Sequence, residues 1–502
     1  MTLWQSTPIK QVKMENRIDH NAPTPSPWLS LIPFVTLIAL LIIVIRIFGT
    51  DAMEGGSQIA LLCSAAVAAA VAMIFCKVSW KSMEDGIATQ VKSITSAVLI
   101  MFMIGAVAGS WMISGVVPTL IYYGLKILTP KIFLFAVCII CALVSVMTGS
   151  SWATIATIGV AFIGIGSVLG FSPGWTAGAI ISGAYFGDEI SPLSDTTVLS
   201  SSMNDVPLFT HIRYLLITAV PSLCIAMIVF LIVSLTHESA SELQVQEFSE
   251  ALCGTFHITP WLLIVPVLMG IMIAKKMPAL QTLFLSALAA GITALIAQPE
   301  LIASIGGGHS AAEMFKGLCI TFYGDTAVPT SNEALSTLVQ TRGMRGMLST
   351  VFLILAASAF GGVVTGSGMV QSLTKAMMKV ITGRKSLVTT TVATGLFSNV
   401  ATADQYLSIL LVSNFFKNLY KEKGYEGRLL SRATEDSVTV TSVLVPWNTC
   451  GMTQSTVLRV PTLDYLPYCV FNILAPFMSI IVACIGYKIF RVKDVEAAPS
   501  EA

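Results

Sequence analysis

The sequence predicts an all-α polytopic membrane protein with about ten transmembrane helices, two re-entrant hairpins, and inverted repeats whose helices are interrupted by proline. Of the 502 residues, 55% are hydrophobic and only 11% are charged, a balance unlike that of soluble domains. Several apolar runs approach the ~20 residues that cross a bilayer. The lysines and arginines form short clusters between these runs, as a membrane topology requires.

The charge clusters predict how the chain is oriented. Basic clusters lie at residues 77–92, 275–276, 375–385 and 417–432, and acidic loops lie at 51–54 and 238–250. Because cytoplasmic loops carry the excess of lysine and arginine, both termini are expected in the cytoplasm. The predicted parts are a cytoplasmic tail (1–27), a first membrane repeat (28–235), an extracytoplasmic loop (236–258), a second, inverted membrane repeat (259–490) and a cytoplasmic tail (491–502).

Two apolar stretches are predicted to enter the membrane and return to the side from which they came. The first is 131–170, with TGSSWAT (148–154) in its middle, and the second is 386–416, with VATADQY (400–406) in its middle. A full crossing at the second stretch would place the basic segment 417–432 outside. Small and polar residues at each tip can satisfy a non-helical backbone that is buried in protein at membrane depth.

An internal repeat relates the two halves. A shift of 253 positions lays residues 106–131 on 359–384 with eight identities, and lays Ser151 on Asp404. With the same shift, Pro192 falls one residue from Pro446. By the charge-based topology the two copies have opposite orientations, and inverted repeats with broken helices are typical of secondary transporters. A chance match of apolar sequence is the alternative.

The first polar motif, GDEISPLSDTT (187–197), is predicted to interrupt a transmembrane helix. Pro192 has no N–H and crowds the carbonyl four residues back, so the Asp188 carbonyl loses its helical partner and becomes a candidate ligand. Oxygen ligands without histidine or cysteine suit a hard ion. We therefore predict a Na⁺ site at Asp188 and Asp195, although a solvated turn is the alternative. The candidate ion-binding residues are Ser150, Asp188, Glu189, Ser191, Ser194, Asp195, Thr196, Asp404 and Asn448.

The second motif, ATEDSVTVTSVLVPWNTCG (433–451), repeats the interruption at Pro446. Glu435 and Thr439 share a helix face, and with Asp436 they are candidates for a proton relay or gate. The alternative places both acids in the first turn of a helix, beside a cytoplasmic Arg432. Asp404 lies at the second hairpin tip, where it is either a ligand or the cap of the following half-helix.

Other patterns narrow the class of protein. A net charge of +1 gives no indication of a nucleic-acid partner, and the chain has no GK[ST] phosphate-binding loop. We therefore expect no enzymatic activity and no cofactor, with ion gradients as the source of energy. His211 and Arg213 are expected at the cytoplasmic interface. No arginine is expected inside the spans around the two motifs, which favours a cation as the sole cargo.

GDEISPLSDTTVLSS, together with TGSSWAT, TADQYL and EDSVTVTSVLVPWN, resembles the NhaC-type Na⁺/H⁺ antiporter family of the ion transporter superfamily. The resemblance covers residues 80–487 and implies a multi-pass transporter of the bacterial inner membrane. It also implies that a transport domain moves against a scaffold to give alternating access. Similar proteins differ in substrate, so the motif indicates cation coupling more firmly than it names the cargo.

The leading hypothesis is an antiporter that expels Na⁺ in exchange for H⁺ by competition at Asp188 and its neighbours. The alternative is a Na⁺- or H⁺-coupled carrier or exchanger of a small organic acid, of the malate/lactate type, or of an amino acid. The expected partners are Na⁺, H⁺ and the lipid bilayer. A homodimer is left open by the sequence.

Overall fold

The computed structural model describes residues 25–48, 54–237, 242–275, 277–330 and 332–492. Most of the two predicted tails therefore lies outside the described residues. Within those ranges the chain is helical, and two isolated β-bridges are its only extended pairings. Eight of the described helices are long and apolar enough to cross a membrane, or up to ten if each of two bent pairs counts as one span. The all-α polytopic class is confirmed.

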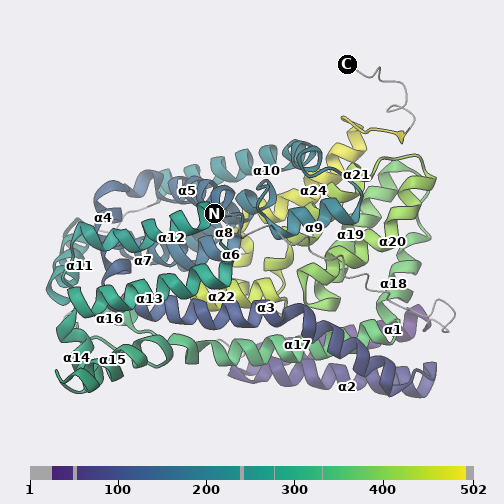
Figure 1. The fold of residues 1–502 in the computed structure, drawn as a ribbon. Helices are drawn as coiled ribbons and strands as arrows, with labels where there is room; N and C mark the ends of the chain where they lie inside the picture. Colours follow the sequence, from purple (N-terminus) through teal and green to yellow (C-terminus); the bar gives the residue numbers. More distant parts are fainter. Residues whose placement is uncertain (1–24, 49–53, 238–241, 276, 331, 493–502) are drawn as a thin grey trace, which may run out of the picture.

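The first half contains ten helices in the described residues. They are α1 (Pro27–Phe48), α2 (Gly56–Cys76), α3 (Trp80–Ile113), α4 (Val116–Ile127), α5 (Phe133–Thr148), α6 (Ser151–Thr154), α7 (Val160–Val168), α8 (Pro173–Glu189), α9 (Asp195–Met203) and α10 (Leu208–Thr236). A π-helical segment, Ile155–Gly159, joins α6 to α7. Figure 1 shows α10 and α5 along one edge of the molecule, opposite α2 and α3.

The middle of the chain begins with a helix inside the predicted loop 236–258. The helices here are α11 (Glu242–Thr255), α12 (Ile264–Ala274), α13 (Ala279–Ala297), α14 (Pro299–Gly306), α15 (Ala311–Tyr323) and α16 (Glu333–Val339). The segments Leu243–Thr255 and Pro260–Ala274 meet at an angle of 88°. In Figure 1, α11 and α14 to α16 gather at the end of the molecule remote from α18 and α20.

The second half contains the remaining described helices and repeats the pattern of the first. They are α17 (Leu348–Gly366), α18 (Met369–Met378), α19 (Arg384–Thr402), α20 (Gln405–Glu422), α21 (Gly427–Thr434), α22 (Thr449–Leu458), α23 (Thr462–Tyr465) and α24 (Val470–Ile485). A second π-helical segment, Glu435–Thr439, and a 3₁₀ turn, Ser442–Leu444, lie between α21 and α22.

Helices α3 and α17, which correspond to each other in the repeat, pack side by side (Figure 1). A β-carbon at Gly86 would clash with the carbonyl of Gly362, and one at Gly105 would meet Gly343, just before α17. The residue numbers at these contacts increase along α3 and decrease along the segment that leads into α17, so the two helices are antiparallel. Small residues allow the backbones to touch. The antiparallel pair supports the predicted inversion of the repeats.

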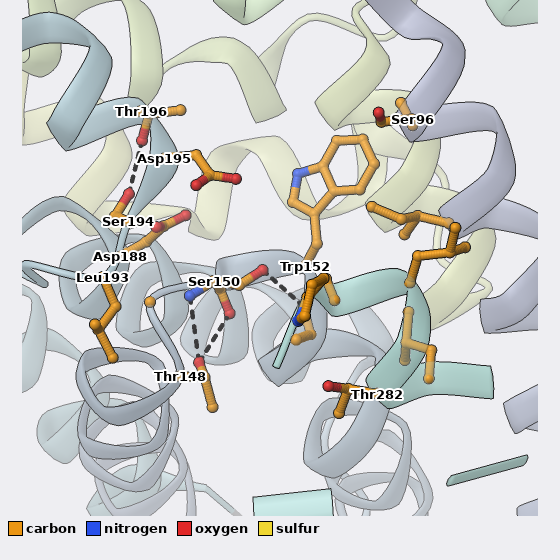
Figure 2. Close-up of a pocket in the computed structure, with 18 of the residues that line it drawn as sticks. Ser96, Thr148, Ser150, Trp152, Asp188, Leu193, Ser194, Asp195, Thr196 and Thr282 are labelled. Atoms are coloured by element: carbon orange, nitrogen blue, oxygen red, sulfur yellow. Dashed lines mark hydrogen bonds between the residues drawn. The ribbon is translucent and has the colours of Figure 1, made fainter. Parts of the chain in front are cut away.

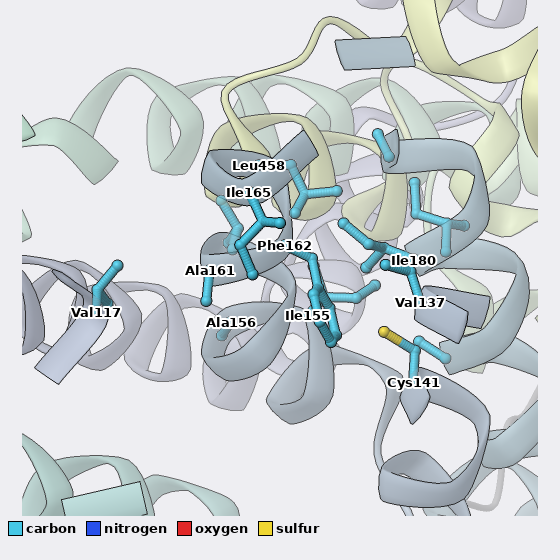
Figure 3. Close-up of a cluster of buried hydrophobic side chains, with 14 of the residues drawn as sticks. Val117, Val137, Cys141, Ile155, Ala156, Ala161, Phe162, Ile165, Ile180 and Leu458 are labelled. Carbon is cyan, nitrogen blue, oxygen red and sulfur yellow. The ribbon is translucent and has the colours of Figure 1, made fainter. Parts of the chain in front are cut away.

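Both predicted hairpins return to the side from which they start. At the open end of the first, the Phe133 ring lies 5.2 Å from that of Phe171, which follows α7. In the second, the Thr391 hydroxyl on α19 lies 3.0 Å from the Tyr420 hydroxyl near the end of α20. Figure 3 shows how the arms of the first hairpin pack with α8 and α22 through buried hydrophobic side chains.

Left-handed backbone positions recur in both halves. Gly115 and Gly368 begin α4 and α18 with φ of 83° and 76°. Gly149 and Ala403 turn the two hairpin tips, Asp205 lies in the turn after α9, and Arg459 is the C-cap of α22, all with positive φ. The first pair is offset by 253 positions and the other two pairs by 254. The predicted repeat is therefore present, but one residue is added between α18 and the second tip.

Candidate functional site

The first hairpin tip is shaped by Gly149. This residue has φ of 66°, where glycine carries no steric penalty, and a β-carbon here would clash with Leu193. Ser150 then caps α6, because its Oγ accepts a hydrogen bond from the Ala153 N–H at 3.2 Å. The tip therefore lies directly against the first helix interruption.

The helix interruption at Pro192 forms as predicted, between α8 and α9. Ser194 caps α9 by accepting from the Thr197 N–H at 3.4 Å. The Asp188 carbonyl is not left without a donor, however. That oxygen accepts from the Ser191 N–H at 3.2 Å and from Thr197 Oγ1 at 3.3 Å, so the turn and a hydroxyl replace the helical donor that proline removes.

The side chain of Asp188 points to the hairpin tip. Its Oδ2 accepts from the Ser151 backbone N–H at 3.1 Å and from Ser151 Oγ at 2.7 Å. Only 8% of Asp188 is exposed. Two donors from the positive end of α6 thus hold a nearly buried carboxylate in one orientation.

The second hairpin and second interruption are joined in a similar way. Thr449, the first residue of α22, donates its N–H to the Ala403 carbonyl at 2.9 Å. Asp404 caps α20 by accepting from the Leu407 N–H at 2.9 Å, and Thr449 Oγ1 donates to its other oxygen at 3.4 Å. Asp404 is therefore a helix cap, and it also faces the cavity described next.

A central cavity of about 940 Å³ lies where both hairpin tips, the first interruption, α3 and α12–α13 meet. Figure 2 shows Asp188, Ser194, Asp195 and Thr196 close together near the first tip, which also carries Trp152, with Ser96 of α3 farther across. Three carboxylates line the cavity, and no lysine, arginine or histidine does so within the described ranges. The described residues also hold no group of three or more His, Cys, Asp or Glu side chains suited to a metal ion.

Half of the predicted site residues face this cavity and half do not. Those that line it are Ser150, Asp188, Pro192, Ser194, Asp195, Thr196 and Asp404. Ser191 instead donates to the Val146 carbonyl at 2.8 Å, which ties the interruption to α5. Asn448 donates to the Asn399 carbonyl at 3.2 Å, inside the second half. Those that lie away from it are Glu189, Ser191, Glu435, Asp436, Thr439, Pro446 and Asn448.

A family model described as the Na⁺/H⁺ antiporter family matches residues 24–205 and 183–487. The chain belongs to this family. The resemblance indicated by the motifs is therefore confirmed.

Relatives in this family are named for different transported substances. The chain is 35% identical to the Na⁺/H⁺ antiporter NhaC of Alkalihalophilus pseudofirmus, over 83% of this chain and 88% of the relative. It is also 35% identical to the malate-2H⁺/Na⁺-lactate antiporter of Bacillus subtilis, over 83% and 86%. The arginine/ornithine antiporter ArcD of Halobacterium salinarum is 31% identical over 95% and 96%. Family membership alone does not choose among these cargoes.

This member of the Na⁺/H⁺ antiporter family has a second group of ionisable residues, which we call the buried cluster: Glu189, Arg432, Glu435 and Asp436. All four have no exposed surface. Thr218 of α10 donates to Asp436 Oδ1 at 3.0 Å. In the part of the chain that the structure describes, no donor reaches the carboxylate oxygens of Glu189 or Glu435 in hydrogen-bonding geometry.

The buried position of Arg432 corrects two expectations about the cytoplasmic side. Arg432 is not a solvated flanking residue, because its guanidinium lies 4.3 Å over the Tyr214 ring and donates no hydrogen bond to any described residue. His211 is also fully buried, with Nδ1 2.9 Å from Ser431 Oγ, whereas Arg213 is exposed as expected. The alternative that Glu435 opens a helix is wrong too, because α21 begins at Gly427.

Sequence reasoning missed several residues that the geometry brings to the two sites. Ser151 was part of a quoted motif, but only the folded tip shows that it holds Asp188. Thr449 and Tyr406 line the cavity from the second half. Arg432 had a usable signal, because it precedes Asp436 by four residues and so shares its helix face.

Proposed function

We propose that the protein is a Na⁺/H⁺ antiporter of the bacterial inner membrane, with both termini in the cytoplasm. The observation that carries the proposal is the lining of the central cavity, which has three carboxylates, several hydroxyls and no described basic residue. Such a lining attracts a hard cation and repels an organic anion. Asp188 and Asp195 are the proposed Na⁺ ligands, with Ser194 and Thr196 hydroxyls beside them.

Coupling follows from charge at this site. A carboxylate that takes up a proton loses the negative charge that holds Na⁺, so the two cations compete. Asp188 and Asp195 come from the first repeat and Asp404 from the second, and all three face the same space. Movement of either hairpin tip therefore changes the site as a whole.

The test is transport in everted membrane vesicles from cells that lack other antiporters, followed with a pH-sensitive dye. Addition of Na⁺ alone is expected to move protons, and vesicles without the protein serve as the control. A response that requires malate, lactate or an amino acid would sink the proposal.

A second candidate, exchange of a cationic amino acid, is favoured by the size of the cavity. About 940 Å³ is within the range of sites that enclose small organic molecules, and acid side chains suit a positively charged substrate. Proton or Na⁺ movement in the same vesicles that begins only on addition of arginine or ornithine would support this candidate. Proton movement on addition of Na⁺ alone supports Na⁺/H⁺ antiport.

Replacement of Ser151 by alanine is expected to weaken the Na⁺ response while leaving the fold intact. The variant loses the 2.7 Å hydrogen bond to Asp188 but keeps the backbone donor. Since a hydrogen bond to a charged group contributes about 1.5–3 kcal/mol, the half-saturating Na⁺ concentration is expected to rise roughly tenfold or more. Ser151→Thr keeps the hydroxyl and is the matched control. An unchanged Na⁺ dependence in Ser151→Ala would contradict this role.

A further inference from the structure

A second cavity, of about 630 Å³, lies beyond the central one. It is enclosed by α3 and the start of α17 on one side, and by the first hairpin and the end of α22 on the other. Among the described residues, Ile104 of α3 lines both cavities and no other residue does so. Hydroxyl side chains line much of the second cavity: Thr326, Thr341, Ser349, Thr350, Ser455 and Thr456.

The charges around the second cavity suit a cation in transit and not one that is held tightly. Two acidic and two basic residues line it in the described chain, so no net charge attracts or repels a cation. Both acids lie at the solvated rim, since the side chains of Glu54 and Asp325 are 60% and 59% exposed. A buried carboxylate comparable to Asp188 is not part of this lining.

The two cavities follow one another along the same three elements. On α3, the central cavity is lined between Ser93 and Ile104, and the second between Ile104 and Ala108. The first hairpin contributes Ala153 to the central cavity and Ala156 to the second. Helix α22 contributes its first residue to the central cavity and its last turn to the second. About one helical turn, ~5 Å, therefore separates the two cavities along α3 and the hairpin.

The cavities extend toward opposite faces of the membrane. The central cavity reaches Pro278 in the turn between α12 and α13, close to Lys275, whereas the second reaches Thr350 at the start of α17. Because α3 and α17 are antiparallel, the start of α17 lies at the face away from Lys77, which precedes α3. Basic residues mark the cytoplasmic face. The central cavity thus extends toward the cytoplasm, and the second cavity extends toward the outside.

Nearly buried apolar side chains close the passage between the cavities. Ile104 is 1% exposed and Ala156 is 4% exposed. Behind Ala156, the returning arm of the hairpin packs on α22: a β-carbon at Gly159 would lie 3.4 Å from Leu458, and Figure 3 shows Leu458 against this arm. The hairpin arm and α22 therefore form one side of the passage, and α3 with α17 forms the other.

Two hydrogen bonds join these sides across the second cavity. Thr350 Oγ1 on α17 lies 2.7 Å from Thr456 Oγ1 on α22. Arg459, the C-cap of α22, donates from Nη2 to the Gln340 carbonyl at 2.6 Å. The hairpin arm and α22 cannot move away from α3 and α17 without breaking both bonds.

We propose that the second cavity is the extracytoplasmic exit route of the cation, and that Ile104 with the Thr350–Thr456 hydrogen bond forms its outer gate, which is closed in this structure. This inference rests on the proposed function and on the proposed orientation. A cation enters the central cavity from the cytoplasm. It leaves when the hairpin arm and α22 move away from Ile104, and the proton enters by the same route.

The first experiment fastens the gate with a disulfide. In a protein that carries both Thr350→Cys and Thr456→Cys, oxidation is expected to lower the Na⁺-dependent dye response about tenfold or more, and dithiothreitol is expected to restore it. Binding of radioactive ²²Na⁺ to the purified oxidised protein is expected to stay within about twofold of the reduced form, because the central cavity still reaches the cytoplasm. Each single variant, oxidised in the same way, is the control.

The second experiment fills the route without a cross-link, and it stands even if the double variant fails to fold. Ala108 lines the second cavity but not the central one. Ala108→Trp is expected to lower the dye response about tenfold and to leave ²²Na⁺ binding within about twofold of wild type. Leu99→Trp, at a residue of α3 that is 46% exposed, is the matched control and should transport like wild type.

A third experiment tests the two faces without relying on transport. With a membrane-impermeant maleimide, Thr350→Cys is expected to react in spheroplasts, and Ser96→Cys, in the central cavity, is expected to react in everted vesicles. Wild type gives the background from the native cysteines. If Na⁺ alone moves no protons in wild type, the proposed function fails, and this labelling still tests the two cavities.

Three results would overturn the inference. Full transport by the oxidised double variant, with the disulfide verified by mass spectrometry, would show that the gate does not have to open. A loss of ²²Na⁺ binding in both the oxidised double variant and Ala108→Trp would make the second cavity part of the cation site. Reaction of Thr350→Cys and Ser96→Cys from the same face would place both cavities on one side of the membrane.

Discussion

Replacement of Asp188 by asparagine is expected to abolish Na⁺-driven proton movement. Asp188 is the carboxylate that the first hairpin tip holds through Ser151, and it faces the central cavity. A unit charge about 4 Å from a cation contributes about 4 kcal/mol at an effective dielectric constant of ~20. Loss of that charge lowers Na⁺ affinity roughly a thousandfold. The everted-vesicle assay and ²²Na⁺ binding both measure the effect.

The matched control is Asp205→Asn. Asp205 lies in the turn after α9, 60% exposed, and pairs with Lys417 at 2.7 Å. The hydrogen bond from Lys417 lowers the pKa of Asp205, so this substitution also removes a charge that is present at neutral pH. Because an exposed ion pair contributes little, transport is expected to stay near wild type. Equal activity of both variants would refute the assignment of Asp188.

A leucine at position 183 is expected to prevent stable folding of the first half. Gly183 lies on α8 where it meets α5, and even a β-carbon would clash with the backbone carbonyl of Cys138. Because the obstacle is backbone and not a flexible side chain, the cost is expected at or above the upper end of the usual overpacking range, about 3 kcal/mol. Separation of α5 from α8 would also pull Ser151 away from Asp188.

Thermal stability of the detergent-solubilised protein, followed by size-exclusion chromatography, measures this effect. Gly270→Leu on α12 is the control, because a β-carbon there meets nothing within 4 Å. The control should elute and melt like wild type, whereas Gly183→Leu should aggregate or melt at a clearly lower temperature. A Gly183→Leu protein as stable as the control would mean that α5 and α8 can separate without loss of the fold.

The parts of the fold that could be predicted from sequence are those set by local chemistry. Pro192 and Pro446 each lack a backbone donor, so both interruptions follow from a single residue type. Gly149 with Ser150, and Ala403 with Asp404, place a reversal and a cap at each tip. The proline pair already lies 254 positions apart in the sequence, but eight identities cannot locate where the extra residue is inserted within apolar sequence.

The site was harder to predict because it depends on contacts between distant segments. Nothing local to Asp188 indicates that Ser151 and Thr197 occupy its carboxylate and carbonyl oxygens. Charge counting also misplaced Arg432, because a basic residue near a membrane boundary is usually solvated, and only the packing of α10 on α21 encloses it. The sequence identified candidate residues of the site, but it did not indicate the directions in which their side chains point.

The glycine contacts between α3 and α17 have a mechanical consequence. Two helices that touch backbone to backbone at Gly86 and Gly362 leave no room for a side chain between them. We therefore expect α3 and α17 to move together as one rigid unit. Ser93 and Ser96 of α3 form one wall of the cavity, so a displacement of the hairpin tips relative to this helix pair is expected to change the shape of the cavity. A disulfide between α3 and α17 is expected to leave transport unchanged, whereas a disulfide from α3 to a hairpin tip is expected to stop transport.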